Sequence, residues 1–108
     1  MKKVNDITLS KKHQQLYDSA KSRDIYFDLS LRHLRKMMSR KTCFYTGVRF
    51  DDVQHKPSIE RVDSTKGYTD DNTVIVSESI NKAKSNLTEN QLKLILKAIQ
   101  KHKQLMNK

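Results

Sequence analysis

A chain of 108 residues is long enough for one domain with a modest core, and only 2 glycines and 1 proline exclude an all-β fold rich in tight turns. Lysine and arginine outnumber aspartate and glutamate by 22 to 12, and the resulting net charge of +10 favours a polyanionic partner. The single cysteine excludes a disulfide framework and a cysteine-rich zinc site, and there is no apolar run of the roughly 18 residues that a membrane span needs. We therefore expect a cytoplasmic protein without structural zinc and without a membrane partner.

The N-terminal part of the chain predicts two helices. Residues 10–22 form the first, with Ser10 as its N-cap, and only three apolar residues share one face, so we expect it to pack lightly. The second is predicted from the N-cap Ser30 to about Ser39, where apolar residues recur at helical spacing.

The middle of the chain predicts short strands and one helix. Residues 42–55 alternate apolar and polar positions around Gly47, which indicates a short β element with a turn. Strands are predicted near 57–63 and 73–76, and a helix follows at about 77–85.

The last predicted helix has the clearest start signal. Thr88 and Gln91 match the capping box, and lysines gather toward the C-terminal end, where the helix dipole favours positive charge. We expect this helix to serve as scaffold and to pack against the domain through an apolar stripe formed by Leu92, Ile95, Leu96 and Ile99.

Residues 57–84 carry the most informative pattern: a short strand with an acidic residue, a glycine-containing turn, an asparagine-led return strand, and a helix that presents Asn81. This order resembles the core of HNH, or ββα-metal, nucleases. The resemblance covers roughly residues 28–100, where the chain is similar to a group of small phage and bacterial HNH-like proteins. It rests on Cys43-Phe-Tyr-Thr-Gly47, Ser58-Ile-Glu-Arg-Val-Asp63, Gly67-Tyr68, Asn72, Asn81 and Lys84.

The resemblance implies an α+β fold. Two short antiparallel strands and a helix would form the ββα-metal core, with N-terminal and C-terminal helices packed around it. Residues 1–27 would form an N-terminal helical arm, and residues 28–108 the HNH-like nuclease domain. The setting would be the cytoplasm of a prokaryote or of a phage-infected host cell.

The resemblance also implies a metal site. Glu60 and Asn81 occupy the positions that hold one divalent cation in the family, Mg²⁺ first and Mn²⁺ as the alternative, and such hard cations prefer oxygen ligands. Asn72 matches the central asparagine of the catalytic motif, which in the family ties the loop together through hydrogen bonds. Lys82 and Lys84 flank Asn81 on the side expected to face phosphate. Together with Lys66 and Arg61 they are the predicted nucleic-acid-binding residues.

One motif position departs from the family. Arg61 stands where the general-base histidine follows the acidic metal ligand, and arginine stays protonated and cannot act as a base. Three interpretations are open: His55 activates water from just upstream, Arg61 binds the phosphate while the metal alone activates water, or cleavage has been lost. A register slip could also place Asp63 in the site, although strand alternation puts Glu60 and Asp63 on opposite faces.

Each candidate has a structural alternative as well. Glu60 and Arg61 could pair with neighbours on an exposed strand, Asn81 could pack locally, and His55 could be an ordinary loop residue. The other three histidines lie on predicted helix surfaces and look incidental.

Two functions therefore compete. The first is a metal-dependent DNA endonuclease or nickase that hydrolyses phosphodiester bonds. The second is a catalytically degenerate HNH-fold module that binds nucleic acid or a host protein, for example a phage regulatory factor. The two differ in their dependence on a divalent metal, and the basic composition suits both.

Overall fold

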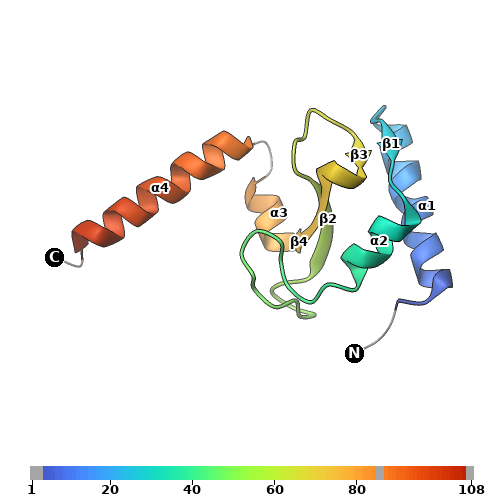
Figure 1. Cartoon of the computed structure of the whole chain (residues 1–108), viewed down its shortest axis with the longest axis horizontal. Coiled ribbons are helices and arrows are strands. Elements are labelled where there is room, and N and C mark those ends of the chain that lie inside the picture. Colours follow the sequence, from blue (N-terminus) through green and yellow to red (C-terminus); the bar gives the residue numbers. More distant parts are fainter. Residues whose placement is uncertain (1–3, 85–86, 107–108) are drawn as a thin grey trace.

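The structure is a computed structural model that describes residues 4–84 and 87–106, with the side chain of residue 84 outside the described part. Within these ranges the chain is a mixed α+β protein with four α-helices and two small sheets (Figure 1), so the predicted fold class is confirmed at this level. The elements are α1 Asp6–Ser22, β1 Phe27–Asp28, α2 Leu31–Met38, β2 Pro57–Arg61, β3 Tyr68–Thr69, the 3₁₀ turn η1 Asp70–Asn72, β4 Thr73–Ser77, α3 Glu78–Lys84 and α4 Glu89–Met106.

The centre of the fold is an antiparallel strand pair followed directly by a helix. β2 pairs with β4 in a register that sets Ser58 opposite Val76 and Glu60 opposite Val74, and α3 begins at the residue after β4. Both strands and the helix fall where the sequence predicted them, within two residues at each end that the structure describes.

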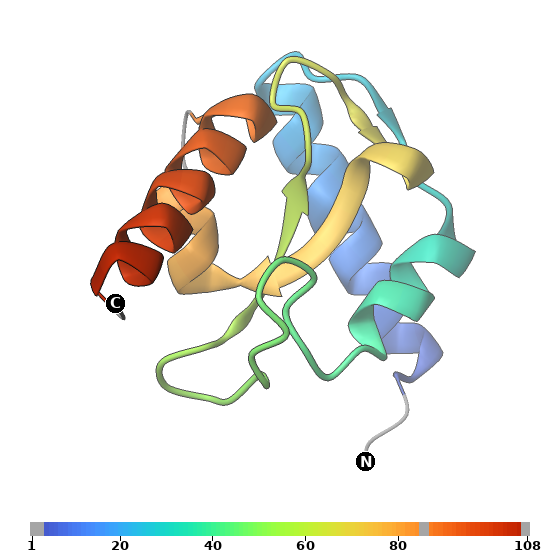
Figure 2. The same cartoon turned by 60° about the vertical axis from the view of Figure 1, so that its left-hand side comes forward.

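The two faces of this strand pair have different neighbours. Ile59 and Ile75 lie opposite each other and contact the apolar core that α1 and α2 supply. Because side chains alternate along a strand, Ser58 and Glu60 project from the other face. Figure 2 shows the strands lying between α1 and α2 on one side and α3 and α4 on the other. Glu60 therefore lies on the side of α3.

Helix α1 differs from its prediction. It begins at Asp6, four residues before the predicted start, and its N-cap is Asn5, whose side-chain oxygen accepts a 2.8 Å hydrogen bond from Thr8 N. The earlier start adds Leu9 to the apolar face, and this face buries Leu9, Leu16 and Ala20 in the core. The expectation of light packing was wrong because the predicted helix omitted Leu9.

Helix α2 begins as predicted. Ser30 is its N-cap, and the Ser30 hydroxyl accepts a hydrogen bond of 3.0 Å from His33 N. Leu34 and Met37 are buried against the core, and the opposite face of the helix is exposed.

A second sheet was not predicted. β1 and β3 form a parallel pair of two residues each, with Phe27 opposite Tyr68. Gly67 permits this approach, because a Cβ atom at that position would overlap the carbonyl oxygen of Tyr26. The same carbonyl accepts a 2.8 Å hydrogen bond from Tyr68 N.

The outer edge of β4 is covered. Phe44 N donates a 3.0 Å hydrogen bond to Ile75 O, and His33 Nε2 donates a 2.9 Å hydrogen bond to Thr73 O. Phe44 belongs to the short β element predicted at 42–55, which the structure forms as a bridge between Thr42 and Arg49. The edge of β4 that does not pair with β2 is thus protected from pairing with another strand.

Helix α4 begins with the predicted capping box, in which Thr88 and Gln91 exchange hydrogen bonds of 2.8 and 3.1 Å. The predicted packing of its stripe is not seen: no residue of α4 is buried by the described part of the chain, and Leu96 and Ile99 are 56% and 49% exposed. Figure 1 shows the helix extending away from the other elements. None of the described helices combines the length and apolarity needed to cross a membrane.

Candidate active site

Glu60 is the fourth of the five residues of β2, with only 9% of its surface exposed. Strand β2 positions it, and the alternation of the strand turns its carboxylate toward α3 rather than toward the apolar core. A buried carboxylate is costly unless its surroundings compensate, so the surroundings of Glu60 are informative.

Asn81 is brought to the same face of β2. Its side-chain Nδ2 donates a 3.0 Å hydrogen bond to the hydroxyl of Ser58. Ser58 and Glu60 are two residues apart in one strand, and therefore project from the same face. This bond leaves the amide oxygen of Asn81 with its acceptor capacity. The carboxylate and the amide predicted as metal ligands thus lie on one side of the sheet, on neighbouring elements.

Tyr45 lies near enough to Glu60 for the charge of that carboxylate to act on its phenol, although no sequence pattern selects this residue. Burial, together with the negative charges of Glu60 and Glu89, raises the pKa of Tyr45 to about 12. The phenol, like that of any tyrosine, is protonated at neutral pH and can donate a hydrogen bond. The motif residues 43–47 carried part of the family resemblance, but no local pattern relates Tyr45 to a strand 15 residues further along.

Arg61 does not lie with Glu60. Its guanidinium donates hydrogen bonds of 2.9 and 2.8 Å to the carbonyl oxygens of Ser64 and Lys66, and it lies over the ring of Tyr68 at 5.3 Å. These contacts hold the loop between β2 and β3, on the face of the strand opposite to Glu60.

Asn72 is buried and binds the same loop. Its Oδ1 accepts a 2.9 Å hydrogen bond from Asp63 N, and its Nδ2 donates to the carbonyl oxygens of Asp63 and Gly67 at 3.1 and 2.8 Å. All three bonds are structural, which is the loop-tying role that the family assigns to this asparagine. Asp63 itself lies in this loop, where its Oδ1 accepts bonds from the backbone and the hydroxyl of Thr65.

His55 lies at one end of the strand pair. Its Nδ1 is 3.2 Å from the hydroxyl of Ser77, which is paired with Pro57 at the start of β2. Glu60 is three residues further along β2, which corresponds to roughly 10 Å of extended strand. The structure does not bring the His55 ring beside Glu60.

The predicted nucleic-acid-binding lysines are dispersed. Lys82 forms an ion pair of 3.3 Å with Glu78 one turn earlier in α3, and Lys66 has an exposed side chain in the loop after β2. The side chain of Lys84 lies outside the described residues.

Two histidines that looked incidental connect elements. His13 Nε2 on α1 donates a 2.7 Å hydrogen bond to the carbonyl oxygen of Leu29, and His33 on α2 covers the edge of β4 at Thr73. Their roles depend on partners far away in the sequence, so their own neighbours gave no signal.

The donor set suits a hard cation. No group of three or more histidine, cysteine, aspartate or glutamate side chains that could hold a metal is found among the described residues. The side-chain oxygens on this side of β2 that could hold a cation are those of the Glu60 carboxylate and the Asn81 amide, and water would complete the coordination. Mg²⁺ commonly binds in this way, with one or two protein ligands and several waters.

Comparison with known proteins finds a similar phage protein. No protein-family model matches the chain, and no solved structure matches it. It is similar to an uncharacterized 29.0 kDa protein of the dda-modA intergenic region of enterobacteria phage T4, with 33% identity over 76 residues. The match covers 68% of this chain but only 31% of that protein's length, so two thirds of the relative has no counterpart here.

Proposed function

We propose that the chain is a metal-dependent nuclease of the HNH type that hydrolyses phosphodiester bonds in DNA. The observation that supports this most is the hydrogen bond between Asn81 and Ser58, since it sets the amide of α3 on the same face of β2 as the Glu60 carboxylate. A strand with a carboxylate, a return strand and a helix with an asparagine then converge on one site.

The residues would have separate roles. Glu60 and Asn81 would hold one divalent cation, Mg²⁺ or Mn²⁺, which when bound would polarise the scissile phosphate. Ser58 orients the Asn81 amide through its hydrogen bond. Tyr45, whose phenol is protonated at neutral pH, would donate a hydrogen bond to a phosphate oxygen beside Glu60.

A second candidate is a nucleic-acid-binding module without cleavage. It is favoured by the positions of the two residues on which the catalytic interpretations depend. Arg61, the suggested phosphate ligand, is engaged by loop carbonyls, and His55, the suggested base, lies at the end of the strand pair away from Glu60. In this case the basic surface would be the functional feature and Glu60 would be a structural carboxylate.

A plasmid assay separates the two candidates. Supercoiled plasmid is incubated with the wild type, Glu60→Gln and Asn81→Ala, with Mg²⁺ or Mn²⁺ and with chelator. For a nuclease we expect metal-dependent nicking that falls roughly 100-fold or more in both variants, because losing a metal ligand removes several kcal/mol of transition-state stabilisation.

Matched controls are the exposed Asn90→Ala on α4 and the exposed Asp52→Asn, which should nick like the wild type. Retardation of the plasmid without cutting, unchanged by chelator and by both site variants, would instead establish the binding module.

A further inference from the structure

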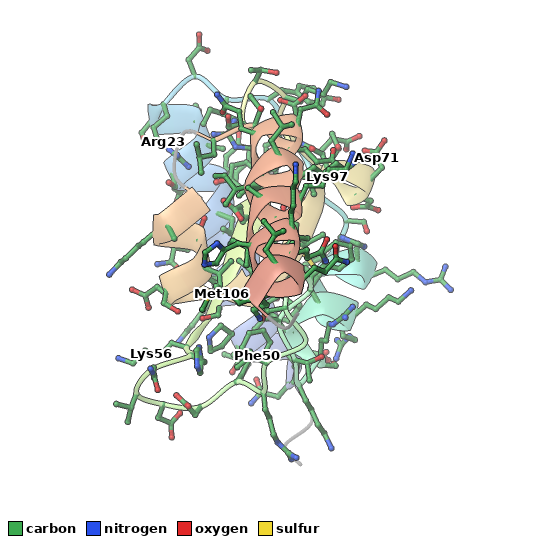
Figure 3. All side chains as sticks on the ribbon, turned by 90° about the vertical axis from the view of Figure 1, so that its left-hand side faces the viewer. Arg23, Phe50, Lys56, Asp71, Lys97 and Met106 are labelled. Carbon is green, nitrogen blue, oxygen red and sulfur yellow. The ribbon has the colours of Figure 1, made fainter. Side chains whose placement is uncertain are left out.

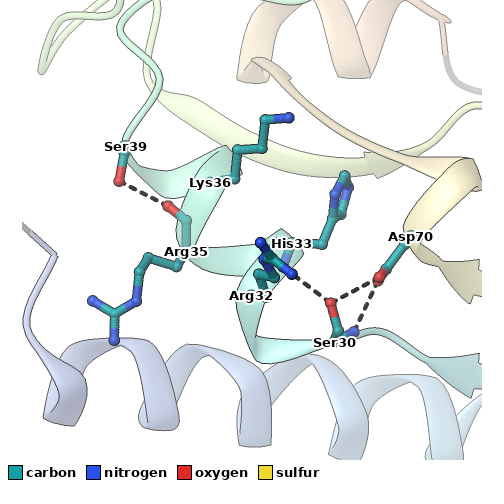
Figure 4. Close-up of a pocket in the computed structure, with 7 residues that line it drawn as sticks. All are labelled: Ser30, Arg32, His33, Arg35, Lys36, Ser39 and Asp70. Atoms are coloured by element: carbon teal, nitrogen blue, oxygen red, sulfur yellow. Dashed lines mark hydrogen bonds between the residues drawn. The ribbon is translucent and has the colours of Figure 1, made fainter.

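The exposed face of α2 is strongly basic. Four of its eight residues are Arg32, His33, Arg35 and Lys36, and its first turn has no acidic residue. These side chains line an open groove of about 440 Å³, shown in Figure 4, together with Ser30, Ser39 and Asp70. The groove lies outside the Glu60 site and shares no residue with it.

Two of the charges in this groove are already engaged. Arg35 turns toward α1 (Figure 4), where it donates a 2.9 Å hydrogen bond to Val4 O and forms an ion pair with Asp6. Both carboxylate oxygens of Asp70 accept hydrogen bonds from Ser30, at 2.9 Å from the backbone N–H and at 2.7 Å from the hydroxyl. The only carboxylate of the groove is therefore held at the N-terminus of α2.

Arg32 and Lys36 remain as uncompensated charges. Both side chains are exposed, and neither makes a hydrogen bond or an ion pair within the described part of the chain. They are four residues apart in a helix and so lie on one face, where two like charges repel each other. An anion bound between them would remove this repulsion.

We propose that the α2 groove binds the phosphate backbone of nucleic acid, through Arg32 and Lys36, as a contact separate from the Glu60 and Asn81 site. The proposal rests on the proposed function in that it takes nucleic acid to be the substrate. The planar guanidinium of Arg32 matches two phosphate oxygens, and the ammonium of Lys36 acts as a point charge.

The position of the α2 groove predicts how this contact affects binding and cleavage. α2 packs on the α1 side of the strand pair, whereas Glu60 faces α3 (Figure 2). The groove therefore holds nucleic acid away from the reacting phosphate, and it contributes to affinity without contributing to the chemical step.

The test is the salt dependence of binding. A fluorescein-labelled DNA duplex is titrated with full-length protein in chelator, with KCl varied at constant pH, and anisotropy gives the binding constant. The double variant Arg32→Gln, Lys36→Gln should make the negative slope of log K against log salt shallower by about 1.8, which is 0.9 for each of two lost phosphate contacts. At 0.1 M salt this corresponds to roughly 60-fold weaker binding.

The control variant removes the same charge from another helix. Lys97→Gln, Lys101→Gln changes two exposed lysines with the same spacing on α4, which Figure 1 shows extending away from α2. Figure 3 shows the Lys97 side chain on this helix. Its slope should match the wild type within error. Equal losses in the two double variants would show a general charge effect, and an unchanged slope in the α2 variant would show that no phosphate binds there. Either result overturns the proposal.

Two further arms complete the design. Inorganic phosphate, compared with chloride at equal ionic strength, should not displace the duplex; displacement would identify free phosphate as the ligand and contradict a backbone site. Arg32→Lys, with Lys36 kept, should restore most of the slope.

The result is independent of cleavage, because binding is measured without metal and is repeated with Glu60→Gln. If cleavage is absent but the α2 slope falls, only the nuclease proposal fails. If cleavage occurs but the slope is unchanged, only the groove proposal fails.

Discussion

Glu60 and Arg61 are adjacent in β2, and the alternation of side chains gives them opposite surroundings. Glu60 projects on the side of α3, the helix that carries Asn81, whereas Arg61 turns to the loop carbonyls of Ser64 and Lys66. The side chain at position 61 therefore has a structural role, since its guanidinium reaches two loop carbonyl oxygens. An arginine held in this way contributes to stability whatever the chain does chemically.

Arg61→Ala tests this role. We expect it to lower the free energy of unfolding by about 1–2 kcal/mol, because two hydrogen bonds to carbonyls and a cation–π contact are lost from a partly exposed site. Urea denaturation measures the loss. Lys66→Ala is the control: it keeps the carbonyl that accepts from Arg61, and should change stability by less than about 0.5 kcal/mol.

Arg61→His extends the same argument to activity. Since position 61 faces away from Glu60, this variant should not raise the plasmid nicking rate above that of the wild type. A clear increase would show that the side chain at 61 reaches the site of Glu60 in solution.

Some side-chain contacts could be predicted from the sequence and others could not, for a physical reason. The loop-tying contacts of Asn72 follow from a motif whose residues are near in sequence, so they were accessible. Tyr45 was missed because its relation to Glu60 exists only after the element at 42–49 is placed beside the strand pair. His33 was missed because its partner, the carbonyl of Thr73, is 40 residues away.

The N-cap of helix α2 is joined to the 3₁₀ turn η1 by two hydrogen bonds between Ser30 and Asp70. Ser30 caps the helix through its hydroxyl oxygen, and its N–H and O–H both donate to Asp70. The backbone N–H of Ser30, with the hydroxyl adding to it, lowers the pKa of Asp70 below its ordinary value of 3.8. Two segments distant in sequence thus meet at a charged, partly solvated hydrogen-bond pair.

The pH dependence of Asp70→Asn follows from that lowered pKa. A carboxylate with a depressed folded-state pKa adds stability above its unfolded pKa, and this contribution disappears as pH falls through the folded value. Near neutral pH we expect the wild type to be more stable by less than about 1 kcal/mol, since Asp70 is exposed. The difference in Tm should shrink toward zero below pH 3.8.

Thermal unfolding between neutral and acidic pH makes this measurement. Asp52→Asn, an exposed carboxylate, controls for the change in net charge and should show a smaller difference near neutral pH. A Tm difference for Asp70→Asn that persists or grows in acid would contradict the assignment of charge to this contact.

Element boundaries were predictable where local signals exist. The caps of α2 and α4 are encoded by Ser30 and by Thr88 with Gln91, each within a few residues of the bonds they make. The parallel pair of β1 and β3 was not predictable, because two-residue strands about 40 residues apart have no periodicity to detect. It forms because Gly67 permits a close approach of two segments of the chain.

The apolar residues are distributed unevenly between the core and the exposed helix α4. α1, α2, β2 and β4 share one core that includes Leu9, Leu34 and Ile75, whereas α4 keeps its large apolar side chains in contact with water. The longest dimension of 54 Å, against 34 and 21 Å for the others, agrees with the extension of α4 in Figure 1. Periodicity identified α4 as an amphipathic helix, but it contains no information about what the apolar face contacts.

A leucine-to-alanine substitution in α2 and another in α4 test this difference in burial. Leu34 is fully buried, so Leu34→Ala should cost about 2–5 kcal/mol of unfolding free energy through lost transfer energy and the cavity left behind. Leu96 is 56% exposed on α4, so Leu96→Ala should change stability by less than about 0.5 kcal/mol. Denaturant titration at two protein concentrations measures both. A large, concentration-independent loss for Leu96→Ala would mean that α4 packs on its own domain in solution. A loss that grows with protein concentration would mean that it packs on a second copy, and either would contradict the exposed position of α4.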